Sequence, residues 1–395
     1  MIKKEINEIK SLFNIEDCGI RKIACCYVNG EKEKVTKFTE TFLNLPEEER
    51  HKYFDIFRKT LSGTQGKNLL DMKFNLSAYG EDGAQAMLME LKNSGLEDEK
   101  LLDLFYDKII KSYNYPGNYI IILINQTYDI PGKTTDGIAM EDASDEIYNY
   151  ILCSICHVIL SKPGLGYNEE ENTFHNQRQF HMIDLPDIGF LFPAFNDRSE
   201  DRDIVLYYTK DVNNFQTEFI SYILDSQIPL PAGSQKETFQ TLVTETLGEE
   251  CDYETIKNIH ENLNEMIQQK KDEPEPAVLD RNSARQLLEK SGVKEEKLEH
   301  FEEQFDNAAG ESGKLLATNV AEIRKFELKT PDIVVKINPS KTDLVKTMVI
   351  EDKQCLVIEI DERLEVNGIS VNPYTGEVLE RESEAIEYGE VAKHE

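Results

Sequence analysis

The run "YIIILI" at residues 119–124 is the strongest constraint that this sequence places on its own fold. An unbroken apolar run has no polar face, so a strand at this position must be covered on both sides. The run is far shorter than the ~18 apolar residues that a helix needs to span a bilayer. We therefore expect a buried central strand in a sheet that helices flank.

The rest of the chain divides into strand-like and helix-like patterns, which favour an α+β protein with a mixed sheet, flanking helices and a small C-terminal helical and β module. A hairpin is expected over 20–38, with Asn29-Gly30 as a two-residue turn. Further strands are expected at 148–160, 172–183, 189–195, 204–210, 332–339, 347–361 and 364–372. Helices are expected at 1–12, 45–63, 97–112, 236–248 and 252–271, and a helical pair at 283–305.

Shifts in composition suggest where the chain divides. The stretch "QQKKDEPEPA" at 268–277 is charged and contains two prolines, which is typical of a linker. We expect a mixed α+β region over 1–230, a helical segment over 231–271, a linker at 272–277 and the C-terminal module over 278–372. Residues 373–395 are acidic and weakly apolar, which predicts a flexible tail.

The charge balance bears on partners. The chain carries 44 Lys and Arg against 75 Asp and Glu, a formal net charge of −31. Such a field repels phosphate backbones and anionic lipid surfaces, so we expect no direct nucleic-acid binding and no membrane association. The start "MIKKEINEIKSLF" lacks the apolar segment of a secretory signal, and the seven cysteines follow no disulfide framework. These features favour a cytoplasmic protein with reduced thiols.

The stretch "CSICH" has the spacing that attaches a c-type haem, with Cys153, Cys156 and His157. In a strand, Cys153 and Cys156 point to opposite faces while Cys153 and His157 share one, so the three cannot meet one haem. No second CxxC pair completes a zinc site. We expect buried thiols in a core strand, with no metal and no cofactor.

Two other motif matches are incomplete. "YDIPGKTTDG" at 128–137 has Thr127 where a phosphate-binding loop needs its first glycine, so nucleotide binding is not expected. The helical pair within 284–305 resembles a helix-turn-helix, but its second helix is rich in glutamate. DNA would repel that helix, which favours a packing or protein-docking role.

The loop "FNDRSEDRD" at 195–203 is the densest in chemistry. Asn196, Asp197 and Arg198 are weak candidates for a polar site, with Arg198 able to bind a carboxylate or phosphate through two parallel hydrogen bonds. His175 and His181 join the candidates because they share one face of the expected strand, although roughly 20 Å apart. The alternative is an exposed hairpin loop whose charges pair with one another.

Several long blocks together resemble a bacterial family, domain of unknown function four-three-one-seven. They are "LPEEERHKYFDIFRKTLSGTQGKNLL", "YILCSIC", "SKPGLGYN", "GFLFPAFNDRS", "IPLPAGSQKETFQ" and "NIHENLNEMI". The resemblance runs from Lys3 to about Val371. It implies no activity, cofactor or catalytic residue.

Three hypotheses about function remain open. The charge, the modular C-terminus and the incomplete cofactor motifs favour a non-catalytic factor that binds a protein partner, through its acidic surface or through 278–372. The alternative is a hydrolase-type enzyme with a polar site around 195–203. A third possibility is a nucleic-acid mimic that occupies basic sites on another protein.

Overall fold

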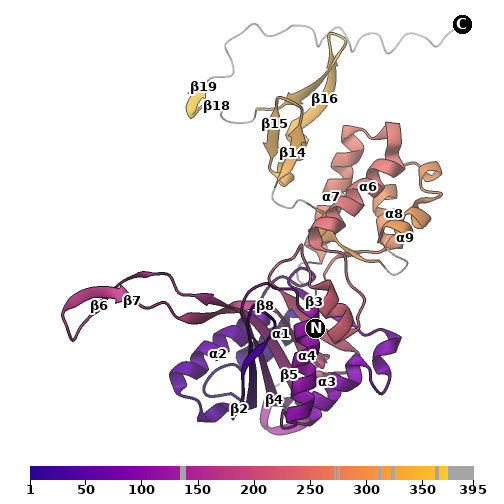
Figure 1. Cartoon of the computed structure of the whole chain (residues 1–395). Coiled ribbons are helices and arrows are strands. Elements are labelled where there is room, and N and C mark those ends of the chain that lie inside the picture. The colour runs from indigo at the N-terminus through magenta and orange to yellow at the C-terminus, as the bar shows by residue number, and fades with distance from the viewer. Residues whose placement is uncertain are drawn as a thin grey trace, which may run out of the picture. The chain divides into compact units, whose positions relative to one another are not determined.

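The computed structural model describes residues 1–133, 139–270, 273, 276–309, 313–321, 325–360 and 364–371, with only the backbone of 132–133, 139–145, 177 and 249. The expected tail at 373–395 lies outside these residues. Contacts divide the chain into two compact units, Met1–Glu322 and Ile323–Glu395 (Figure 1).

A seven-stranded sheet forms the centre of the first unit. Its order is β2-β1-β4-β5-β8-β11-β3, and every neighbouring pair is antiparallel, so the sheet is not mixed. The α+β class expected from the sequence is confirmed. The strands are β1 (Ile20–Val28), β2 (Lys34–Thr41), β3 (Leu69–Lys73), β4 (Tyr119–Lys133), β5 (Ala139–Leu160), β8 (His181–Phe192) and β11 (Ile204–Thr209).

Helices cover both faces of this sheet (Figure 1). One face packs against α1 (Lys3–Ser11) and α2 (Glu47–Thr60), and the other against α3 (Ala84–Asn93), α4 (Glu99–Ser112) and the short segments α5 (Thr217–Phe219) and η3 (Ile220–Leu224). Alternate residues of the run at 119–124 enter the two cores, and all six are buried. The apolar run is therefore a central strand buried on both faces, as expected.

The flanking helices begin and end at residues that favour helix ends. Three glutamates occupy the first turn of α2 behind Pro46, and Arg58 and Lys59 occupy its last turn, which complements the helix dipole. Asp98 caps α4 by accepting hydrogen bonds from the backbone amides of Lys100 (2.9 Å) and Leu101 (3.1 Å). The sequence reading identified both helices and missed α3 and β3.

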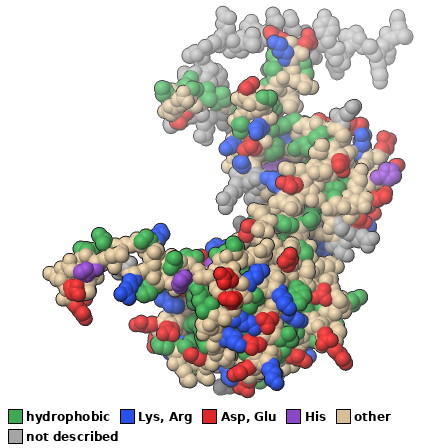
Figure 2. All heavy atoms as spheres, in the orientation of Figure 1, with side chains coloured by type: hydrophobic (Ala, Val, Ile, Leu, Met, Phe, Trp, Pro, Cys, Tyr) green, Lys and Arg blue, Asp and Glu red, His purple; other side chains and the backbone are tan. Residues whose placement is uncertain are grey.

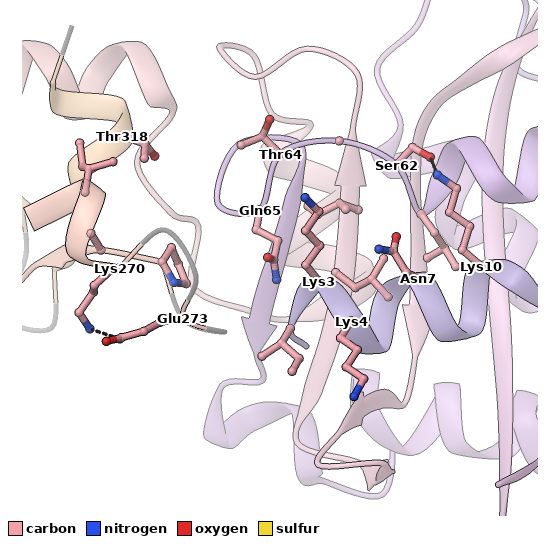
Figure 3. Close-up of a pocket in the computed structure, with 18 residues that line it drawn as sticks. Lys3, Lys4, Asn7, Lys10, Ser62, Thr64, Gln65, Lys270, Glu273 and Thr318 are labelled. Carbon is pink, nitrogen blue, oxygen red and sulfur yellow. Dashed lines mark hydrogen bonds and ion pairs between the residues drawn. The ribbon is translucent and has the colours of Figure 1, made fainter. Parts of the chain in front are cut away.

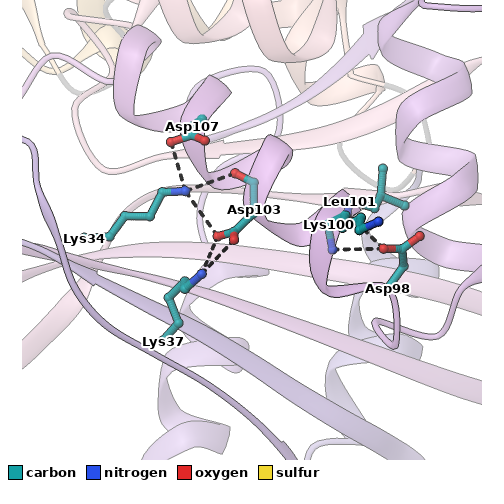
Figure 4. A network of polar contacts seen from close by, with 7 residues as sticks. All are labelled: Lys34, Lys37, Asp98, Lys100, Leu101, Asp103 and Asp107. Atoms are coloured by element: carbon teal, nitrogen blue, oxygen red, sulfur yellow. Dashed lines mark hydrogen bonds and ion pairs between the residues drawn. The ribbon is translucent and has the colours of Figure 1, made fainter.

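Ion pairs hold α4 against the edge strand β2 (Figure 4). Lys34 Nζ lies 2.9 Å from Asp107 Oδ1 and 3.2 Å from Asp103 Oδ1, and Lys37 Nζ lies 2.7 Å from Asp103 Oδ1. These contacts lower the pKa of Asp103, chiefly through the hydrogen bond from Lys37. Two lysines on the outermost strand also discourage pairing with another chain.

The hairpin between β1 and β2 differs from the expected two-residue turn. Its loop spans residues 29–33, because the Asn29 side-chain oxygen accepts hydrogen bonds from the backbone amides of Glu31 (3.0 Å) and Glu33 (2.9 Å). Asn118 then accepts a hydrogen bond from Gly30 N at 2.9 Å, which ties the loop to the start of β4. The side-chain contacts of Asn29 widen the turn.

A third core lies within the same unit and combines helices from both sides of the expected linker. Its elements are α6 (Ala232–Leu247), η4 (Gly248–Glu250), α7 (Tyr253–Gln269), β12 (Val278–Leu279), α8 (Arg281–Lys290), η5 (Glu295–Lys297), α9 (Phe301–Ala309), β13 (Leu315–Leu316) and α10 (Ala317–Val320). Ala277, which we placed in the linker, is buried in this cluster. Contacts place the division of the chain after Glu322, and the linker at 272–277 stays a prediction.

Within its described residues, the second unit holds three antiparallel hairpins. Its elements are β14 (Phe326–Lys329), β15 (Val334–Ile337), η6 (Pro339–Leu344), β16 (Val345–Ile350), β17 (Lys353–Ile358), β18 (Leu364–Val366) and β19 (Ile369–Val371). Glu351 and Asp352 form the turn between β16 and β17, both with positive φ. Strands are confirmed within 332–339, 347–361 and 364–372, but each of the last two stretches forms a hairpin, and β14 was not expected.

Candidate functional site

The residues proposed at 195–203 form a tight hairpin. β9 (Ala194–Asn196) pairs with β10 (Ser199–Asp201), and Asp197 and Arg198 make the two-residue turn with φ of 50° and 59°. Positive φ at both central residues is what a type I′ turn requires, and aspartate is among the residues that accept it. Asn196, Asp197 and Arg198 are therefore neighbours on one turn.

The Asn196 and Arg198 side chains of this hairpin are engaged within the fold. Arg198 Nη1 lies 2.9 Å from Glu8 Oε1 on α1, and its Nη2 donates to the carbonyl oxygen of Pro131 at 3.2 Å. Tyr128 also donates to Glu8, at 2.7 Å. Asn196 donates to Asp201 at 2.7 Å. The Arg198 guanidinium, which we gave as a weak candidate for binding a carboxylate or phosphate, fastens α1 to the sheet.

The two histidines lie elsewhere, and the expectation that they share one strand is wrong. His175 belongs to β7 (Thr173–Gln177), where its Nε2 lies 2.5 Å from Glu171, whereas His181 begins β8 opposite Leu160. The break between the strands faces Pro163, which has no amide hydrogen to continue the ladder. No contact among the described residues joins either histidine to the 195–203 hairpin.

His157 belongs to a partly buried cluster with Tyr113 and Asp187. The Tyr113 hydroxyl lies 2.9 Å from His157 Nε2 and donates to Asp187 Oδ2 at 2.8 Å, and the two ionisable groups are 3.6 Å apart. Tyr115 stacks on the imidazole with ring centroids 3.7 Å apart. Burial opposes ionisation of Asp187, but hydrogen bonds from His157 and Tyr113 leave its pKa lowered.

The contacts of this cluster join strands of the sheet. It joins the residue after α4 to β5 and β8, and Tyr115 covers one face of the histidine ring. Cys153 and Cys156 are buried in opposite cores, as expected for a strand, and burial raises the pKa of both thiols. Within the described residues, no group of three histidine, cysteine or acidic side chains is placed to hold a metal ion.

Beyond this cluster, β5 and β8 leave the sheet as a two-stranded ribbon that we call the arm, residues 158–185. The ribbon continues through β6 (Gly164–Asn168) and β7, and it projects away from the sheet and its helices (Figure 1). Its exposed large apolar residues are Ile159, Leu160, Leu165, Tyr167, Phe174, Phe180, Met182, Ile183 and Leu185. Figure 2 shows these apolar side chains along the projection and acidic ones near its tip.

The outer part of the arm has one apolar face. Tyr167 lies directly opposite Phe174, with ring centroids 5.3 Å apart, and Leu165 lies two residues before Tyr167 on the same face. Leu165 is 73% exposed and Phe174 64% exposed. The opposite face carries glycines and His175. Asn176 lies opposite Leu165 on the same face, so the exposed apolar face consists of Leu165, Tyr167 and Phe174.

The sequence reading missed this surface. Alternation in "GLGYN" and "TFHNQ" predicts strands with one apolar face, but no local sequence pattern shows whether a helix covers that face. The signal available was the length of the excursion between two core strands, from Val158 to Leu185.

No helix within the described residues is long and apolar enough to cross a membrane. A comparison with curated proteins finds no match. A family model described as a domain of unknown function (DUF4317) matches residues 1–369, nearly the full range over which the sequence blocks resemble that family. The chain belongs to the DUF4317 family.

Proposed function

We propose that this chain is a non-catalytic factor that binds a protein partner through the arm. The observation that carries the proposal is the apolar face of Leu165, Tyr167 and Phe174 on a ribbon over which no helix of the described residues packs. A two-stranded ribbon is at best marginally stable in water, and burial of its apolar face in a partner would stabilise it.

The charge of the arm points to the chemistry of the partner. Glu169, Glu170 and Glu171 crowd the tip between β6 and β7, and the whole chain carries a net charge of −31. This charge repels a second copy of the chain and attracts a basic surface. We therefore propose that the arm docks into an apolar groove of the partner protein. Lysine and arginine side chains of the partner border this groove. The arm replaces residues 278–372 as the surface we favour.

A photo-crosslinking experiment tests the proposal. The full chain carries p-benzoylphenylalanine at Phe174 and is irradiated in lysate of its native host, and the crosslinked product is identified by mass spectrometry. The same experiment is repeated with Leu165→Ser/Tyr167→Ser and with the control Leu76→Ser, a residue that is 94% exposed outside the arm.

The expected result is a defined crosslink to a basic protein that is lost in the arm variant and kept in the control. The purified partner should bind with an affinity that falls as salt rises, because the tip carboxylates contribute to attraction. A crosslink only to a second copy, or one that the arm variant leaves unchanged, would overturn the proposal.

The hydrolase alternative around 195–203 stays an untested prediction. It would need Arg198 to leave Glu8 and Pro131 before it could meet a substrate. We therefore give the arm precedence.

A further inference from the structure

A cavity of about 980 Å³ lies within the first unit, beside α1 (Figure 3). One wall is α1 with the loop that follows α2, and the other includes the end of α7 and α10. Lys67 Nζ donates to the carbonyl oxygen of Thr318 at 3.3 Å, and Asn319 donates to that of Gly66 at 3.4 Å, so hydrogen bonds connect the two walls. The volume is within the range typical of small-molecule sites.

The described lining of this cavity is basic although the chain is strongly acidic. Four lysines and one glutamate contribute to it. Lys10 Nζ donates to Ser62 Oγ at 2.5 Å, and Lys270 lies 3.6 Å from Glu273. No ion pair joins Lys3 or Lys10 to a carboxylate within the described part of the chain. These two cations are therefore available to an anion.

The same cavity has an apolar part. Ile6 and Leu61 come from the first wall and Ile267 from the second, and Leu69 lies on β3 nearby. Figure 3 shows Lys3 reaching toward the loop of Thr64 and Gln65, across the cavity from Lys270. Hydroxyl, amide and ammonium donors thus stand beside aliphatic side chains.

We infer that this cavity binds a small amphipathic anion, a carboxylate or phosphate ester on an aliphatic body. Lys3 and Lys10 bind the head group with Thr64 as a neutral donor, and Lys270 adds its positive charge from the opposite wall. The aliphatic body packs on Ile6, Leu61 and Ile267. A concave site lined mainly by positive charge concentrates anions, and this cavity lies in a protein whose overall negative charge otherwise repels them. This site is separate from the arm.

Isothermal titration calorimetry on the full chain tests the inference with decanoate, decyl phosphate and uncharged decanol. The variants are Lys3→Gln and Lys270→Gln, and the matched control is Lys52→Gln, an exposed lysine of α2 outside the cavity. Each cavity variant should weaken binding of the anion about threefold to tenfold, the size expected for one charge-assisted contact in a partly exposed site. Thermal unfolding checks that all variants fold.

Binding of decyl phosphate alone assigns phosphate esters, and binding of decanoate alone assigns carboxylates. Absence of binding by both anions overturns the inference, as does decanol binding as tightly as decanoate. Equal weakening by Lys52→Gln and Lys3→Gln also overturns it, because the effect would then be one of net charge. The arm variant Leu165→Ser/Tyr167→Ser should bind the anion as the unmodified chain does. Anion binding in the cavity and partner binding by the arm can therefore fail independently.

Discussion

Replacement of Gly189 by alanine should loosen the contact between α2 and the sheet. Gly189 lies on β8 opposite Ser154 of β5. An added Cβ would stand 2.6 Å from Thr60 Cγ2 at the end of α2, and closer still to the carbonyl oxygen of Cys153. Thr60 is itself bonded to the sheet, with its Oγ1 2.7 Å from Ser154 Oγ. The new methyl group would therefore push on both a backbone oxygen and a stiff β-branched side chain.

The expected cost follows from this crowding. Overpacking of a close-packed core costs about 1–3 kcal/mol, and Gly189→Ala should fall in the upper half because the carbonyl oxygen of Cys153 belongs to a paired strand and cannot rotate away. For a folded region of this size, 1 kcal/mol shifts Tm by about 2–4 °C, so a cost of about 2–3 kcal/mol should lower Tm by about 4–12 °C.

Thermal unfolding by far-ultraviolet circular dichroism measures the shift, and amide hydrogen exchange locates it. Gly164→Ala is the control, since an added Cβ there meets no atom within 4 Å. Exchange should accelerate in α2 and β8 of the Gly189 variant and stay unchanged in α6 and α7. Equal Tm values for Gly189→Ala and the unmodified chain would refute the reasoning from close packing.

Three further predictions concern the site residues. The pKa of Asp187 is lowered in the fold, so the stability it contributes is present above its unfolded pKa of about 3.9 and is lost as pH falls through the lower folded value. Asp187→Asn should therefore weaken the pH dependence of the denaturation midpoint between pH 2 and 5. An unchanged pH dependence would count against a stabilising role of the cluster. Arg198→Ala should lower the free energy of unfolding by about 1–2 kcal/mol in urea titrations because it leaves a carboxylate on α1 with one fewer partner, while the more exposed Arg202→Ala should change it by less than about 0.5 kcal/mol. Ellman's reagent should label exposed Cys251 quickly and Cys153 only after unfolding, since burial raises the pKa of the Cys153 thiol well above its usual range; fast labelling of Cys153 in native protein would contradict its place in the core.

The fold class could be predicted because its signals are local. The apolar run at 119–124 fixes a strand buried on both faces, and Asp98 and Pro46 mark helix starts by their own chemistry. The short strand Leu69–Lys73 was missed because its identity comes from pairing with β11, more than a hundred residues away. Sequence patterns report what a segment prefers, not which distant segment completes it.

The candidate site shows the same limit. The turn at Asp197 and Arg198 was placed between apolar strands, but Glu8, which pairs with Arg198, lies 190 residues earlier in the sequence. The strand predicted through His175 and His181 failed because the missing amide of Pro163 acts on the facing strand. The pairing of Arg198 and the exposure of the arm depend on which distant segments make contact, and a local sequence pattern does not show this.

The position of the arm within the strand order determines how force on the arm is transmitted to the sheet. β5 and β8 are neighbours in the interior of the sheet, and each continues from its core section into the arm. A pull along the arm at its tip moves β5 and β8 in the same direction, so it acts as shear on the ladders that join them to their outer neighbours β4 and β11. Force applied to the arm is therefore shared among the hydrogen bonds of these two ladders.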